Sequence, residues 1–237
     1  MSSLNSIDIP KSVWKIGEYA FVDCKSLNKI EIPSSVAVIG EAAFEDCRGL
    51  QDIVIGEGVK TIMKGAFNFC GLIESIVIPS SIESIGDEAF KGCIKLKNIN
   101  IKNGVRKLGK KVFGSCVQLE KITIPDSVTS IDCGAFSECL NLRHVELSRS
   151  ITKIPAFMFN HCASLSKITI ESNIEQIEKY AFRNTKIREI DLSKRELIIE
   201  ESIFEGCLEI KTIKLKKSGP EYVDKYLGCE GVELIYV

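Results

Sequence analysis

The sequence is poor in the features on which catalysis, nucleic-acid binding and membrane insertion usually depend. Its 237 residues include only two histidines, and 31 basic residues against 32 acidic ones leave a net charge of −1. This balance gives no electrostatic basis for attracting nucleic acid, so we expect no nucleic-acid partner. No run of about 18 apolar residues occurs, so we expect no transmembrane segment. Residues 1–6 lack the basic and apolar regions of a secretory signal peptide, which favours a cytoplasmic location.

Catalytic sequence motifs are also missing. The chain has no glycine-rich phosphate loop, no dinucleotide-binding fingerprint, no Gly-x-Ser-x-Gly elbow and no His-Glu-x-x-His motif. It also has no Cys-x-x-Cys pair, which is the usual half of a structural zinc site. We therefore predict a protein that is not an enzyme and that binds no cofactor and no metal.

What the sequence does contain is a regular internal repeat. Phenylalanine recurs with seven successive gaps of 23 residues and a last gap of 22. The members of the series are Phe21, Phe44, Phe67, Phe90, Phe113, Phe136, Phe159, Phe182 and Phe204. Ile or Leu precedes each of them by five positions, and Val or Ile precedes most of them by eight. A repeat of this length predicts a solenoid, in which stacked copies bury one continuous core.

Each repeat contains a Leu-x-x-Ile-x-Ile unit whose alternation of apolar and polar residues indicates a half-buried strand. Ten units begin at Leu4, Leu27, Leu50, Ile73, Leu96, Leu119, Leu142, Leu165, Ile187 and Ile210. Stacked at about 4.8 Å, they form a parallel sheet about 45 Å long. We expect a second short extended stretch at Val-x-x-Ile and a short helix or 3₁₀ turn around Ala-Phe-x-x-Cys, which together make an α/β repeat solenoid. Residues 1–216 should form the repeat domain, and residues 217–237 a C-terminal cap with a helical turn at 221–227 and a strand at 232–237.

The full pattern is Leu-x-x-Ile-x-Ile-Pro-x-x-Val-x-x-Ile-Gly-x-x-Ala-Phe-x-x-Cys-x-x, and it resembles the BspA-like (treponemal) class of leucine-rich repeats. The resemblance covers residues 4 to about 216. It implies a right-handed leucine-rich-repeat superhelix of about ten 23-residue turns with a parallel concave β-sheet. It also implies a non-catalytic protein-binding protein, secreted or on the cell surface, with roles in recognition, adhesion and self-association. The alternative is an intracellular scaffold or adaptor that holds a protein partner on its repeat face.

A column of cysteines follows the phenylalanines by three positions, with Thr185 in place of one member. The column consists of Cys24, Cys47, Cys70, Cys93, Cys116, Cys139, Cys162 and Cys207. It is either a metal-binding or redox ladder, or a buried ladder of small side chains at equal height in each turn, which suits cysteine well. Cys133 and Cys229 lie outside the column and are the candidates for reactive thiols. His161 precedes Cys162, but adjacent residues tend to point apart, so we expect no nucleophilic pair there.

The outward positions of the strands should line the concave face, which is the usual interaction surface of such solenoids. Val54 and Val77 are adjacent apolar residues on this face. With neighbouring polar residues they form a candidate binding patch, which comprises Val54, Val77, Asn98, Asn100, Thr123 and His144. The alternative is that the valines simply fill the sheet surface, as β-branched residues often do.

Two further contact surfaces are candidates. Phe157 and Tyr180 share one register on the opposite flank, where they either contact a partner or cover the flank. The first turn should leave an apolar edge exposed, because no polar cap precedes it. The residues of that edge are Leu4, Ile7, Ile9, Val13 and Ile16. Either residues that precede this edge have been lost or a second copy covers it, and we hypothesise a homo-oligomer.

Overall fold

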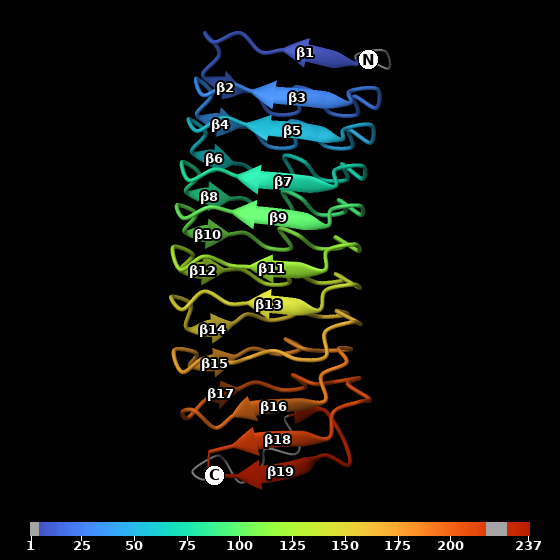
Figure 1. Cartoon of the computed structure of the whole chain (residues 1–237), viewed down its shortest axis with the longest axis vertical. Coiled ribbons are helices and arrows are strands. Elements are labelled where there is room, and N and C mark those ends of the chain that lie inside the picture. Colours follow the sequence, from blue (N-terminus) through green and yellow to red (C-terminus); the bar gives the residue numbers. More distant parts are fainter. Residues whose placement is uncertain (1–4, 217–226) are drawn as a thin grey trace.

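The chain winds into a solenoid of stacked turns that run in order from the N-terminus to the C-terminus (Figure 1). The computed structural model describes residues 5–216 and 227–237. Each turn consists of a long strand, a short strand, and a stretch around the repeated phenylalanine that is called here the Phe segment. The predicted solenoid with parallel sheets is confirmed.

The long strands lie in one column (Figure 1), and all of them except the closing strand β19 carry a Leu-x-x-Ile-x-Ile unit. In chain order they are β1 (Ser6–Asp8), β3 (Lys29–Ile32), β5 (Asp52–Ile55), β7 (Ser75–Ile78), β9 (Asn98–Ile101), β11 (Lys121–Thr123), β13 (His144–Glu146), β16 (Glu189–Leu192), β18 (Thr212–Leu215) and β19 (Glu233–Tyr236). They pair in the groups β1-β3-β5, β7-β9, β11-β13 and β16-β18-β19. Within a group the register follows the repeat, so that Ile30 of β3 lies opposite Ile53 of β5. In β3 the side chains alternate between exposed and buried, as the sequence pattern predicted.

One of the ten expected long strands is absent. Residues 165–171 pass between β13 and β16 without forming a strand. The shortened repeat adjoins this gap, because the step from Leu165 to Ile187 is 22 residues whereas the other steps are 23. The amide of Lys186 consequently donates to the carbonyl of Leu165 (3.0 Å), which changes the offset between these two turns.

The short strands confirm the second extended stretch that was expected at Val-x-x-Ile. They are β2 (Lys15–Ile16), β4 (Val38–Ile39), β6 (Thr61–Ile62), β8 (Ser84–Ile85), β10 (Lys107–Leu108), β12 (Ser130–Ile131), β14 (Lys153–Ile154), β15 (Gln176–Ile177) and β17 (Ile198–Ile199). Six of them form one parallel sheet from β2 to β12. The glycine that follows some of these strands permits close approach between turns, because a Cβ on Gly86 would lie 2.6 Å from the backbone nitrogen of Lys64.

The expectation of a helical Phe segment, and with it of an α/β class, is wrong. In every repeat the residues two before and two after the phenylalanine have positive φ, as Tyr19 (55°) and Asp23 (59°) do around Phe21. Two left-handed residues within five positions cannot belong to a right-handed helix. The amides instead bond between turns, and that of Phe21 donates to the carbonyl of Ala43 at 2.7 Å. Residues 5–216 therefore contain strands and turns only.

The phenylalanine column forms the centre of the core. Rings of adjacent turns stack with their centroids 5.1–5.9 Å apart. From Phe44 to Phe204 these side chains have no exposed surface, whereas Phe21 in the first turn is half-buried. The column is thus fully buried from Phe44 on and half-buried at its first member, Phe21.

The cysteine column is the buried ladder of small side chains that the sequence allowed. Each thiol from the second turn on, except at the position of Thr185, donates to the carbonyl of a phenylalanine in the preceding turn, as Cys47 does to Phe21 at 3.0 Å. That carbonyl also accepts the amide of Cys24 (3.3 Å), so the thiol occupies its second lone pair. Cysteine therefore combines a small apolar volume with a weak donor at this position.

At the C-terminal end, β19 pairs in parallel with β18, and Ile213 lies opposite Leu234. β19 falls within the stretch 232–237 where a closing strand was expected. The predicted helical turn at 221–227 lies, up to residue 226, outside the described residues. The domain boundary after residue 216 therefore stays a prediction.

Candidate binding surface

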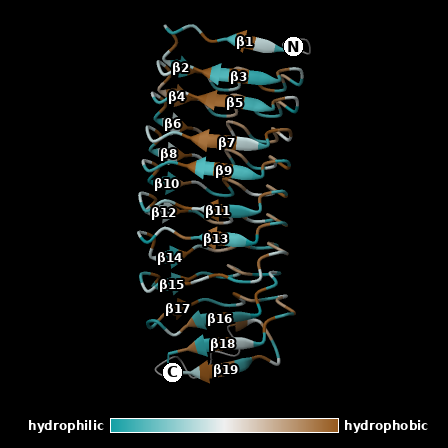
Figure 2. Cartoon of the chain, in the orientation of Figure 1, coloured by the Kyte–Doolittle hydropathy of each residue, from teal (hydrophilic) through white to brown (hydrophobic). Residues whose placement is uncertain are grey.

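The exposed side of the long strands, called here the strand face, is the surface that the sequence predicted as concave. Val54 of β5 and Val77 of β7 are 50% and 53% exposed on it. In register they are flanked by polar residues, because Glu31 lies opposite Val54 and Asn100 lies opposite Val77. In Figure 2 the ends of β5 and β7 are hydrophobic, between the hydrophilic ends of β3 and β9. The two valines therefore form a small apolar area within a polar face.

The polar residues of the predicted patch continue the same face. Asn98 and Asn100 are exposed on β9, Thr123 on β11 and His144 on β13. The hydroxyl of Thr123 donates to the carboxylate of Glu146 in the next turn (3.0 Å). The six residues thus lie on consecutive long strands from β5 to β13, with exposed side chains of apolar, amide and imidazole character.

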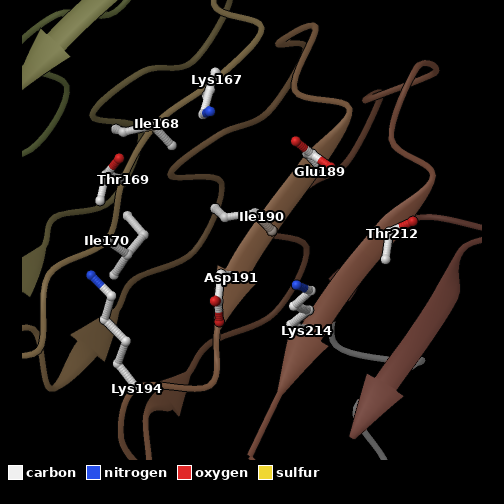
Figure 3. Close-up of a pocket in the computed structure, with 10 residues that line it drawn as sticks. All are labelled: Lys167, Ile168, Thr169, Ile170, Glu189, Ile190, Asp191, Lys194, Thr212 and Lys214. Atoms are coloured by element: carbon white, nitrogen blue, oxygen red, sulfur yellow. The ribbon is translucent and has the colours of Figure 1, made fainter. Parts of the chain in front are cut away.

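The structure adds a hollow that sequence reasoning missed (Figure 3). It has a volume of about 280 Å³ and lies between residues 167–170 and β16. Buried Ile168, Ile170 and Ile190 are among its lining residues, which also include Lys167, Thr169, Glu189, Asp191, Lys194, Thr212 and Lys214. Further hollows of about 710 and 530 Å³ adjoin residues 143–146 and 123–126, and Thr169 lines all three. The only signal in the sequence was the 22-residue repeat that leaves residues 165–171 without a strand.

Charges of both signs surround this hollow. Lys194 forms an ion pair with Glu171 at 3.1 Å. Hydrogen bonds from Ser193, and then the nearby charges of Lys214 and Lys194, lower the pKa of Asp191 below its ordinary value. Its carboxylate therefore stays ionised over the neutral range. The hollow is a mixed-charge surface with an apolar floor, which suits contact with a polar protein surface better than capture of one simple ion.

The two aromatic residues predicted on the flank come together. The rings of Phe157 and Tyr180 stack with centroids 5.0 Å apart and an angle of 28°. The guanidinium of Arg183 lies over the Tyr180 ring at 5.5 Å and pairs with Glu205 at 2.9 Å. Both aromatic side chains are half-buried, so each already covers part of the flank.

The predicted apolar edge is only partly open. Leu4 lies outside the described residues. Ile7, Ile9 and Val13 are half-buried and contact the core, whereas Ile16 is 4% exposed and cannot contribute surface.

All ten cysteines lie in the described part of the chain, and none of them forms a disulfide there. Burial raises the pKa of the Cys93 thiol to about 12, and burial likewise raises the pKa of the less buried Cys133. The thiol of Cys162 donates to the carbonyl of Phe136 (3.2 Å). His161 instead contacts Asn160 (3.0 Å) and Asn184 (3.1 Å) through its ring nitrogens. His161 and Cys162 therefore bond to different partners.

Two absences hold for residues 5–216 and 227–237. No three His, Cys, Asp or Glu side chains in this part of the chain converge as a metal site would require. Nor does it contain a helix with the length and apolar character to cross a bilayer.

Repeated parallel strands, a stacked phenylalanine column and an exposed strand face define the class of leucine-rich-repeat solenoids. The chain belongs to the family of the BspA type leucine rich repeat region (6 copies), whose model matches residues 1–120 and 106–227. Proteins of this class generally bind other proteins and are typically not enzymes.

Several solved structures are similar. A leucine rich repeat protein of T. pallidum shares 28% identity over 68% of this chain and 78% of its own, with a TM-score of 0.62. A leucine-rich repeat protein from Bacteroides ovatus shares 25% identity over 99% of this chain and 69% of its own, with a TM-score of 0.74. A leucine rich cell surface protein from Faecalibacterium prausnitzii, at 24% identity over 94% and 69% of the two chains and a TM-score of 0.50, supports the fold alone. No curated protein matches the chain in sequence.

Proposed function

We propose that the chain is a non-catalytic recognition protein that binds a partner protein on the strand face, over the consecutive strands β5 to β13. The observation that carries the proposal is the half-exposed pair Val54 and Val77, which interrupts a polar face. Asn98, Asn100 and His144 lie beside the pair and offer hydrogen-bond donors and acceptors that can orient the partner.

The energetics suit a moderate contact. Full burial of a valine contributes about 1.5–3 kcal/mol, so covering the exposed halves of Val54 and Val77 adds roughly 2 kcal/mol in total. β-branched side chains lose little rotamer freedom when they are immobilised, which keeps the entropic cost of contact low. The proposed patch therefore supplies a small apolar centre within a polar rim, which is the usual anatomy of a protein interface.

Photo-crosslinking tests the location of this contact. The full-length chain would carry a benzophenone amino acid at Val77 or, as a matched control, at the exposed Ser130 of β12. We expect a crosslinked partner at position 77 in source-cell extract and none at 130, with the yield at 77 reduced about tenfold by Val54→Lys. Equal yields at both positions, or no product at 77, would refute the strand face as the binding surface.

We further propose that recognition occurs at the cell surface, in adhesion. The resemblance to BspA-like repeats supports this setting. A specific observation favours an intracellular scaffold instead: the ten cysteines form no disulfide within the described residues, which suits a reducing compartment. A membrane-impermeant amine label on intact source cells separates the two. Labelling without lysis supports surface recognition, whereas labelling only after lysis removes the adhesin proposal and favours the scaffold.

Self-association is proposed at the first turn, where Ile7, Ile9 and Val13 are half-buried and Phe21 stacks, among the described residues, on the ring of Phe44 alone. A second copy that covers this edge would complete the burial of these side chains. Light scattering over a hundredfold range of concentration should show a mass that rises with concentration, and Val13→Lys should abolish the rise. A monomer mass at all concentrations would contradict this proposal.

A further inference from the structure

A second apolar surface lies on the flank between the Phe segments and the long strands. The residue that follows each cysteine of the column is apolar in consecutive turns, at Ile94, Val117 and Leu140. Ile94 is 52% and Leu140 is 41% exposed, and Val117 is half-buried. Phe69, which is 47% exposed, extends this surface by one turn. These four residues are called here the flank row.

The members of the flank row are neighbours in space. The amide of Gln118, next to Val117, donates to the carbonyl of Ile94 (3.2 Å), and the amide of Asn141, next to Leu140, donates to that of Val117 (3.2 Å). These bonds hold the three apolar residues in successive turns. The ring of Phe69 lies over the turn of Ile94, since a Cβ on Gly92 would meet that ring at 2.5 Å. Ile94, Val117 and Leu140 therefore form a strip along the solenoid axis, and Phe69 lies beside its end, over Gly92.

The turns that carry this strip repeat at nearly the pitch of an α-helix. The phenylalanine rings of the same turns repeat at 5.3, 5.6 and 5.7 Å, and a helix rises 5.4 Å per turn. The difference is no more than about 0.3 Å per turn, so each turn of a helix parallel to the solenoid axis would lie close to one turn of the chain. Its residues at i, i+4, i+7 and i+11 then face successive turns.

Charge at the rim of the strip adds a preference. Lys95 lies in the same turn as Ile94, is exposed, and forms no ion pair with another described residue. Lys91, near Phe69, is already paired with Glu88 at 3.3 Å. An acidic residue beside the apolar face of a bound helix would find an unpaired cation at Lys95.

We propose that the flank row docks an amphipathic α-helix of a partner protein, which lies along the solenoid axis and carries acidic residues beside its apolar face. The flank row is separate from the strand face, so this proposal does not depend on the function proposed above. The apolar surface comprises only four residues, so we expect weak binding.

A designed peptide serves as the probe. It is a fluorescent helix of about 15 residues with Leu at i, i+4, i+7 and i+11 and with Glu and Ala elsewhere. One control peptide has the same composition with the leucines distributed around the helix, and another carries a central proline that breaks the helix. The chain is tested as wild type, as Ile94→Lys/Leu140→Lys, and as Val54→Lys/Val77→Lys, the matched double variant of the strand face. All four substituted side chains are exposed by 41% or more, so the fold should survive, and circular dichroism checks this.

Fluorescence anisotropy should show saturable binding of the amphipathic peptide that is at least tenfold tighter than that of either control. The flank variant should lose at least tenfold in affinity, and the strand-face variant should bind as wild type does. In an isoleucine-methyl NMR spectrum the peptide should shift the Ile94 methyl signal. Equal binding of all three peptides, unchanged affinity in the flank variant, or an unshifted Ile94 signal at saturation would each overturn the proposal.

Discussion

The stacked phenylalanine column leads to a quantitative prediction about where the stability of this solenoid resides. Phe113 has no exposed surface, and its ring stacks on those of Phe90 and Phe136 at 5.6 and 5.7 Å. Phe113→Ala removes a ring that contacts both neighbouring turns. Truncation of a fully buried phenylalanine typically costs 3–5 kcal/mol, so we expect a loss of about 4 kcal/mol in the free energy of unfolding.

Phe21→Ala is the matched control, because the residue change is identical but the site is different. Phe21 is half-buried and stacks on only one ring, that of Phe44, at 5.1 Å. About half the contact is lost, so the expected cost is about 2 kcal/mol. In a solenoid each turn contacts only its neighbours, and the difference between a central and a terminal turn should therefore appear directly in stability.

Urea unfolding measures both losses. Circular dichroism follows the whole chain, and the fluorescence of Trp14, the sole tryptophan, follows the first turn. For Phe113→Ala we expect a lower midpoint in the circular-dichroism curve, and the two probes separate if the weakened centre uncouples the N-terminal turns. An equal cost for the two variants, or a larger one for Phe21→Ala, would refute the assignment of stability to the interior of the column.

Three further outcomes follow from burial and close approach. Ellman's reagent should label Cys133 and Cys229 first in the native protein. The other eight thiols should react only after unfolding, because they are buried. Fast labelling of more than two thiols would contradict this expectation. Burial raises the pKa of Cys93 from 9.0 to about 12. Its contribution to stability is therefore complete below pH 9 and is lost as the pH rises from 9 to 12, so the free energy of unfolding should fall over that range, and less steeply in Cys93→Ala. A Cβ on Gly58 would lie 1.6 Å from a backbone oxygen of the preceding turn, whereas one on Gly17 would meet nothing within 4 Å; Gly58→Ala should lower stability by about 3 kcal/mol and Gly17→Ala should not, as thermal unfolding can check.

Comparison of the two aromatic clusters shows how local contacts change the meaning of an exposed residue. Phe157 and Tyr180 are each partly covered by the other, and Arg183 covers Tyr180 further. Ile94 and Leu140 have more open surface, at 52% and 41% exposed. The aliphatic side chains of Ile94 and Leu140 are therefore more accessible to a partner than the aromatic side chains of Phe157 and Tyr180.

The turns of the Phe segment are reflected in the residue types at their left-handed positions. Fourteen non-glycine residues and four glycines flank the phenylalanines with positive φ, and none of them is Val, Ile, Thr or Pro. β-branched residues and proline are disfavoured in the left-handed region, so their exclusion marks a turn. The apolar and polar pattern of Ala-Phe-x-x-Cys is also compatible with a short helix, which is why a helix or 3₁₀ turn was expected there.

The sequence by itself determined the solenoid, its repeat length, the columns of phenylalanine and cysteine, and the outward positions of the strand face. Those features depend on periodicity, and a 23-residue step places equivalent residues side by side in any stacked arrangement. Only the tertiary structure decided three others: the turns that replace a helix at the Phe segment, the missing strand at residues 165–171, and the exposure of the row from Ile94 to Leu140. Each of these depends on which hydrogen bonds form between turns and on how far one turn covers the next. Such quantities are set by contacts between repeats, whereas the pattern within one repeat specifies only which residues recur.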